Sequence, residues 1–100
     1  MRDYTTLTKE EKTGINKFFE EKAEKYNEES FRHLKDIDTL FFVYDKANYE
    51  FISFGIDLNE AIHNALKWNE KKIDVNYLLE YLNEEFEFIV VSLQYKPRLY

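Results

Sequence analysis

The β-structure of this chain is decided at residues 40–54, which have the sequence LFFVYDKANYEFISF. The two ends of this stretch are rich in aromatic and β-branched residues, a composition typical of strands. The residues between them, Asp45 to Asn48, are polar and compatible with a turn. The pattern therefore predicts a β-hairpin with strands at 39–45 and 49–55.

The first strand of this hairpin is apolar at successive positions rather than at alternating ones. A continuous apolar run indicates a strand that is covered on both faces, and we expect the cover to come from helices or from another subunit. A third strand is predicted at 86–95, where apolar side chains alternate between two faces. One face carries Ile89, Val91 and Leu93, and the other carries Phe88, Val90 and Ser92.

Three helices are predicted, at residues 9–30, 58–71 and 75–84. Thr8 and Glu11 have the spacing of a capping box, in which each side chain accepts a hydrogen bond from the other residue's backbone. Asp57 and Glu60 repeat this spacing before the second helix. Asp74 is a suitable N-cap for the third. The elements then follow the order α-β-β-α-α-β.

This order predicts a single α+β domain covering residues 1–100, without an internal repeat or a linker. We expect the helices to pack on one face of a small, three-stranded, mostly antiparallel sheet. The expected core consists of residues on the apolar side of each element: Phe18, Phe19, Phe42, Ile62, Leu66, Leu79, Leu82, Ile89 and Val91.

Gly14 is unusual because it lies inside the first predicted helix. Glycine costs about 1 kcal/mol relative to alanine in a helix interior. Two explanations are open: the first turns of the helix are loose, or another group packs close to the backbone at this position.

Composition bounds the class of protein. The chain has 100 residues, of which 44% are apolar and 34% charged, as expected for one globular domain. It has no cysteine, so disulfides and thiol chemistry are excluded. No apolar run approaches the roughly 18 residues that a membrane span requires, and the first residues lack the apolar core of a signal peptide. We expect a soluble, cytoplasmic protein without membrane association.

The charge is unevenly distributed. Acidic residues outnumber basic ones by 20 to 14, and residues 74–95 contain five carboxylates but no Lys or Arg. An acidic face attracts a basic partner and repels nucleic acid. Tyrosine is favoured at interfaces because it offers a large rigid surface and a hydroxyl group. The candidate partner-binding residues are Tyr77, Glu80, Tyr81, Glu84, Glu85 and Glu87.

Catalytic, metal and cofactor sites find little support in the sequence. His33 and His63 are the only imidazoles, and their separation of thirty residues has no metal-ligand spacing. Two isolated glycines cannot build a phosphate-binding loop. No serine has the context of an activated nucleophile. We therefore expect no enzyme, no metal and no cofactor, although a pair of the many carboxylates remains open as a catalytic alternative.

These observations predict a binding protein that inhibits or regulates a basic, nucleic-acid-handling partner by covering its charged site. In character the chain resembles phage-encoded inhibitors, such as anti-CRISPR and anti-restriction proteins, and other nucleic-acid mimics. Two further alternatives stay open. One is an antitoxin or immunity protein that neutralises a basic toxin, and the other is a structural homo-oligomer, such as a homodimer built through the apolar hairpin.

Overall fold

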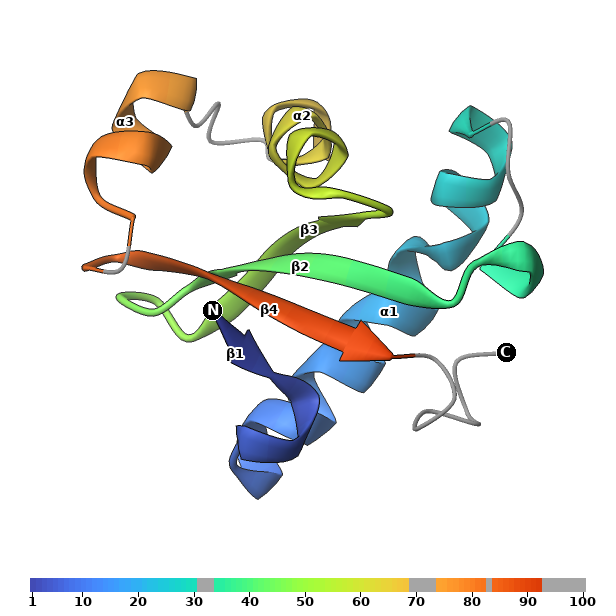
Figure 1. Ribbon diagram of the computed structural model, residues 1–100, viewed down its shortest axis with the longest axis horizontal. Coiled ribbons are helices and arrows are strands. Elements are labelled where there is room, and N and C mark those ends of the chain that lie inside the picture. Colours follow the sequence, from blue (N-terminus) through green and yellow to red (C-terminus); the bar gives the residue numbers. More distant parts are fainter. Residues whose placement is uncertain (31–33, 69–73, 83, 93–100) are drawn as a thin grey trace.

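The computed structural model describes residues 1–30, 34–68, 74–82 and 84–92. Its class is α+β, as the sequence predicts (Figure 1). In chain order the elements are β1 (Arg2–Asp3), the short 3-10 helix η1 (Tyr4–Thr6), α1 (Lys9–Glu29), η2 (Leu34–Asp36), β2 (Thr39–Asp45), β3 (Glu50–Gly55), α2 (Leu58–Trp68), α3 (Val75–Glu80) and β4 (Phe86–Ser92).

The helix starts follow from the caps in the sequence. The hydroxyl of Thr8 accepts a hydrogen bond from the backbone N–H of Glu11 at 3.1 Å, and the carboxylate of Glu11 accepts one from the N–H of Thr8 at 2.8 Å. The carboxylate of Asp57 accepts from the N–H of Glu60 at 2.8 Å. The carboxylate of Asp74 accepts from the N–H of Asn76 at 2.8 Å. All three predicted starts are confirmed.

The ends of three elements differ from the prediction or lie outside the described residues. α3 ends at Glu80 rather than at residue 84. The carbonyl of Tyr81 accepts hydrogen bonds from the N–H groups of the next turn, including Glu85 at 2.9 Å, and this turn leads the chain into β4. The predicted continuations at 69–71 and 93–95 fall outside the described residues.

The sheet has four strands rather than three, in the order β1-β4-β2-β3. β2 pairs antiparallel with β3 and with β4, so the central strands agree with the prediction. β1 pairs parallel with β4, through Arg2 opposite Ile89 and Asp3 opposite Val90, which makes the sheet mixed. The sequence did not predict β1, because a strand of two residues is too short to show a periodic pattern.

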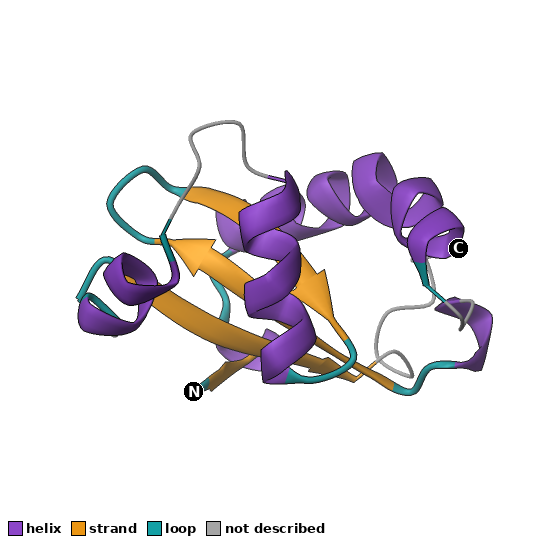
Figure 2. Cartoon of the chain, turned by 90° about the horizontal axis from the view of Figure 1, so that it is seen from above, coloured by secondary structure: helices purple, strands orange, loops and turns teal. Residues whose placement is uncertain are grey.

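Helices cover both faces of the sheet, and the prediction that they share one face is wrong (Figures 1 and 2). Phe42 of β2 packs with Phe19 of α1, whereas the next residue, Val43, packs with Ala65 of α2 and Leu78 of α3. Successive side chains of a strand point to opposite faces. The continuous apolar run in β2 is therefore covered on both sides, as expected, and helices supply the cover.

The core prediction is confirmed in part, because the buried residues form two clusters, one on each face of the sheet, rather than one core. Phe19, Phe42, Ile89 and Val91 are fully buried, and Phe18, Ile62, Leu66 and Leu82 are half-buried. Leu79, by contrast, is 50% exposed, while its neighbour Leu78 is 0% exposed. Adjacent residues of a helix point about 100° apart. A helix as short as α3 can therefore bury only one of the two leucines against the sheet.

Candidate functional site

Five of the six predicted binding residues gather on α3 and on the turn that follows it. The rings of Tyr77 and Tyr81 lie one helical turn apart, with their centroids at 4.6 Å. The hydroxyl of Tyr77 donates a hydrogen bond to Glu85 at 2.6 Å. This bond to a carboxylate raises the pKa of Tyr77 to about 12. The ring is thus held in one orientation by a neighbour on the adjoining turn.

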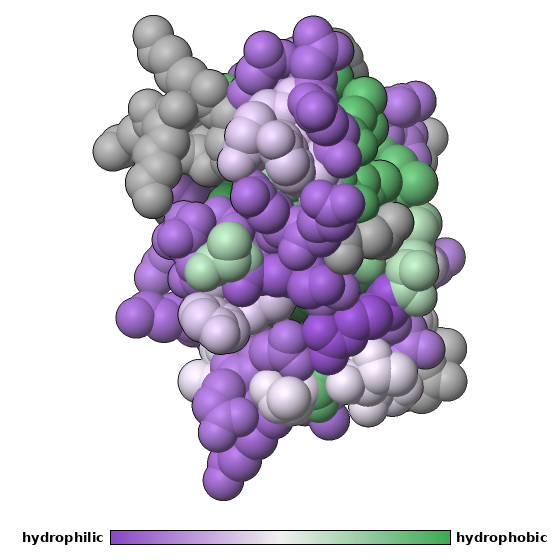
Figure 3. Space-filling model, turned by 90° about the vertical axis from the view of Figure 1, so that its left-hand side faces the viewer, coloured by the Kyte–Doolittle hydropathy of each residue, from purple (hydrophilic) through white to green (hydrophobic). Residues whose placement is uncertain are grey.

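The outer side of this region is both apolar and acidic. Tyr77 is 44% exposed and Leu79 is 50% exposed, and they are two of the four large exposed hydrophobic residues in the described part of the chain. Glu80 and Glu84 are exposed beside them. Figure 3 shows this side of the molecule, where hydrophilic side chains cover most of the surface and apolar atoms gather in a smaller patch. We define the α3 surface as Tyr77, Leu79, Glu80, Tyr81, Glu84 and Glu85.

Glu87 does not belong to this surface. It lies on β4 on the same face as Ile89, which faces α1, whereas α3 covers the other face. Its exposed fraction is 8%, and its carboxylate accepts a hydrogen bond from the guanidinium of Arg2 at 2.7 Å. The absence of bases between residues 74 and 95 concealed this partner, because Arg2 lies 85 positions earlier in the chain.

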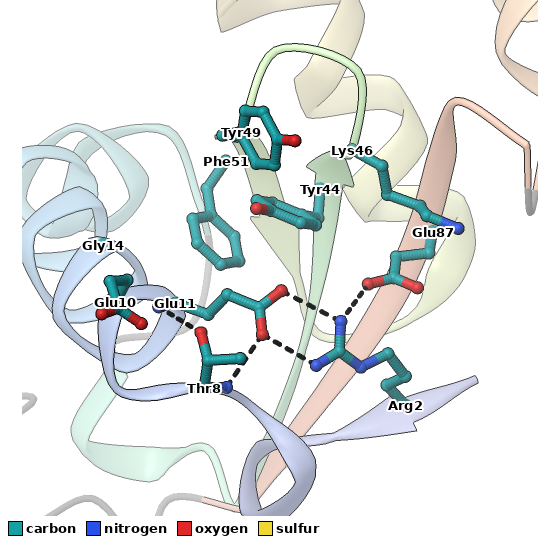
Figure 4. A pocket seen from close by; sticks show the side chains of 10 residues that line it. All are labelled: Arg2, Thr8, Glu10, Glu11, Gly14, Tyr44, Lys46, Tyr49, Phe51 and Glu87. Carbon is teal, nitrogen blue, oxygen red and sulfur yellow. Dashed lines mark hydrogen bonds and ion pairs between the residues drawn. The ribbon is translucent and has the colours of Figure 1, made fainter.

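A second candidate site is a cleft of about 750 Å³ on the α1 face, which the sequence did not predict (Figure 4). Its residues come from β1, the start of α1, the β2–β3 hairpin and the start of β4. Four segments that are distant in sequence thus meet there. We refer to it as the hairpin cleft.

The floor of the hairpin cleft is an ionic cluster around Arg2. Its guanidinium donates two hydrogen bonds to Glu11, at 2.8 and 3.0 Å, in addition to the bond to Glu87. It donates a fourth bond to the carbonyl of Thr6 at 3.1 Å. The bonds from Arg2 lower the pKa of Glu11 to about 2, and the same pairing raises the pKa of Arg2. Glu11 is therefore ionised at neutral pH while it also caps α1.

The hairpin supplies an aromatic wall. The rings of Tyr44 and Phe51 lie 4.5 Å apart between centroids, and Tyr49 lies beside them with 84% of its surface exposed. A Cβ atom at Gly14 would lie 3.4 Å from the ring of Phe51. The ring of Phe51 thus packs beside the α1 backbone at this position, at an ordinary contact distance that leaves room for a methyl group. Gly14 was the one sequence signal that pointed toward this cleft.

Other kinds of site receive no support from the part of the chain that the structure describes. Among those residues, no group of three or more His, Asp or Glu side chains could hold a metal ion. His63 is exposed on α2, and His33 lies outside the described ranges. No described helix is long and apolar enough to cross a membrane.

Comparisons with known proteins do not assign the chain to a group. No family model, curated protein or solved structure matches it. The α3 surface and the hairpin cleft are therefore the features from which a function can be proposed.

Proposed function

We propose that this chain is a small, non-enzymatic binding protein that inhibits or regulates a basic, nucleic-acid-handling protein by docking its α3 surface on that protein's charged site. The observation that carries the proposal is the exposure of Tyr77 and Leu79 among the carboxylates of Glu80, Glu84 and Glu85. Exposed apolar groups rimmed by polar ones mark interaction surfaces. The acidic rim selects a partner of opposite charge.

The local geometry supports tight docking. The hydrogen bond from Tyr77 to Glu85 and the ring contact with Tyr81 hold the tyrosine pair in place before a partner arrives. A preorganised surface loses less side-chain entropy on binding. Carboxylates displayed beside aromatic rings would occupy the positions that phosphates and bases take in a basic groove. This is the mode of action of a nucleic-acid mimic, the type to which anti-CRISPR and other phage anti-defence inhibitors belong in character.

The first experiment reverses the charge of the α3 surface. The double variant Glu80→Lys/Glu84→Lys is compared with Glu20→Lys/Glu24→Lys, which makes the same charge change at exposed positions of α1. Each protein is used as bait in cells that encode it, and candidate partners are those retained by the parent and by the α1 control but lost from the α3 variant. The α3 variant should melt like the parent, because exposed charges contribute little to stability.

The second experiment measures the isolated partner. Its affinity for the parent should fall as salt rises from about 50 to about 500 mM, because the Debye length then shortens from about 14 to about 4 Å. The partner's own DNA or RNA should compete with the protein for binding. The proposal is wrong if the α3 variant binds as tightly as the parent across this range, since the acidic surface would then be merely solvated.

The alternatives differ in how the structure bears on them. An antitoxin or immunity protein would use the same α3 surface, and only the identity of the captured partner distinguishes it. A homo-oligomer built through the hairpin gains less support, because helices cover both faces of β2. In β3, Phe51 and Ile52 are also buried, one in the cluster on each face of the sheet. The α3 surface is therefore the better candidate interface.

A further inference from the structure

We propose that the hairpin cleft binds an organic cation: an ammonium or guanidinium group carried on an apolar body. The cleft is separate from the α3 surface, since it opens on the α1 face of the sheet. Its volume of about 750 Å³ lies within the usual range of ligand pockets, roughly 300 to 1,000 Å³. The proposal concerns a site with its own ligand and does not depend on the proposed function.

The charge of the cleft favours a cation over an anion. Three carboxylates and two cations line it, so its formal charge is negative by one. Arg2 is poorly placed to hold an anion, because each of its two terminal nitrogens already donates two hydrogen bonds. Figure 4 shows Lys46 on the Glu87 side of the cleft, away from Tyr49 and Phe51.

Glu87 provides an acceptor at the bottom of the cleft. The residue is only 8% exposed, and one of its carboxylate oxygens accepts the bond from Arg2. The other oxygen accepts no hydrogen bond from any residue that the structure describes. The Glu87 side chain keeps 11% of its surface exposed, and the ammonium or guanidinium group of a ligand can replace solvent as the donor to this oxygen.

The aromatic wall provides the second half of the recognition. Tyr44, Tyr49 and Phe51 present ring surface to the cleft, and cations bind favourably over the faces of such rings. Tyr49 has a φ of 55°, in the left-handed region that a bulky residue rarely adopts. The structure thus holds an exposed ring at the rim in a disfavoured backbone conformation. A cation between this wall and Glu87 would contact both.

The test is a titration of the whole chain followed by ¹⁵N–¹H NMR. The probes are tetramethylammonium, methylguanidinium, a capped Gly-Arg-Gly peptide, and adenosine monophosphate as an anionic molecule that can also stack. We expect saturable shifts at residues 10–14 and 44–51 with the cations and none with the nucleotide. Tighter binding of the peptide than of methylguanidinium would identify a protein side chain as the source of the cation, and equal or weaker binding would identify a free small molecule.

Two variants test the two halves of the site. Tyr49→Asn removes the ring but keeps a residue that tolerates the left-handed conformation, and it should weaken cation binding about two- to fivefold, the effect of one exposed ring. Glu87→Gln should weaken it further, and Glu10→Gln at the exposed rim replaces that variant if it does not fold. Tyr77→Ala on α3 is the matched control and should bind as the parent does.

Three outcomes would overturn the proposal. One is the absence of saturable shifts with any cation at about 10 mM, ten times a dissociation constant of about 1 mM. Another is nucleotide binding as tight as cation binding. The third is unchanged cation affinity in Tyr49→Asn.

Discussion

At the scale of single residues, the chain's two glycines are constrained by different neighbours. Gly14 lies in α1 with the ring of Phe51 nearby, and a Cβ atom there would meet that ring at 3.4 Å, an ordinary contact distance. Gly55 ends β3, and a Cβ atom there would lie 2.6 Å from the backbone nitrogen of Ala61 at the start of α2. The first site can accept a methyl group, whereas the second cannot without movement of the backbone.

We therefore expect opposite effects of the same substitution. Gly14→Ala should raise the free energy of unfolding by about 0.5 to 1 kcal/mol, because alanine is the better helix former and its methyl group fits. Gly55→Ala should lower it by about 1 to 3 kcal/mol, because the added atom overpacks a backbone contact. Urea melts of both variants give the two values, and a destabilised Gly14→Ala would show that the approach of Phe51 is closer than described.

The ionised state of Glu11 predicts how stability depends on pH. Its pKa in the folded state is about 2, below the ordinary value of 4.5. The resulting stabilisation is complete above the ordinary value and is lost as the pH falls toward 2. We expect the loss to be about 2 to 3 kcal/mol.

Urea melts between neutral pH and pH 2 should therefore show a steep loss of stability in the acid range that Glu11→Gln largely removes. Glu20→Gln, at an exposed position of the same helix, is the control and should keep the parent's pH dependence. If the unfolding free energy of Glu11→Gln falls with pH as steeply as that of the parent, another carboxylate is responsible.

At the scale of elements, α3 shows how a short helix divides its side chains between two roles. Leu78 is fully buried beneath it, and Leu79 is displayed to solvent beside Tyr77. The same helix thus anchors itself to the sheet and presents the proposed binding surface. Because it has only six residues, it depends on this anchor for its position.

Truncation of the two neighbouring leucines separates these roles. Leu78→Ala should cost about 2 to 5 kcal/mol of unfolding free energy, because it leaves a cavity in the core. Leu79→Ala should cost less than about 0.5 kcal/mol, as surface substitutions usually do. Equal losses of unfolding free energy in urea melts of the two variants would contradict the burial of Leu78 and the exposure of Leu79.

Sequence patterns predicted those features of the fold that depend on local chemistry. The three caps placed the helix starts, and the continuous apolar run of β2 predicted its two covered faces. Spacing alone could not choose between Leu78 and Leu79, since both fit the apolar side of a short helix. The hairpin cleft was beyond prediction, because Arg2, Glu11 and Glu87 meet only through the folded sheet.

At the scale of the whole molecule, specific contacts connect α1 with other elements at both edges of the sheet. Beyond β3, the indole N–H of Trp68 donates to Glu29 at 3.2 Å, which connects α2 with the end of α1. At the opposite edge, Arg2 of β1 connects the start of α1 with β4 through Glu11 and Glu87. Pairing and side-chain contacts thus protect both edges of the sheet.

We expect the contact between Arg2 and Glu87 to contribute to the stability of the whole domain. Arg2→Ala should cost about 2 kcal/mol, because it leaves the buried carboxylate of Glu87 without its donor. In a Glu87→Gln background, the same change should cost at least about 0.5 kcal/mol less. A double-mutant cycle in urea measures the coupling, and strictly additive losses would show that the two side chains act independently.

The position of β4 between β1 and β2 has a consequence for synthesis on the ribosome. A nascent chain that has emerged as far as α3 contains both neighbours of β4 but not the strand that joins them. Until residues 86–92 are translated, the edge of β2 that pairs with β4 has no partner strand. The buried face of α1 also lacks its contacts with Ile89 and Val91. Unpaired strands of this kind invite association with other chains. Chains arrested before residue 86 should therefore need chaperones, whereas the sheet can close rapidly once β4 is released.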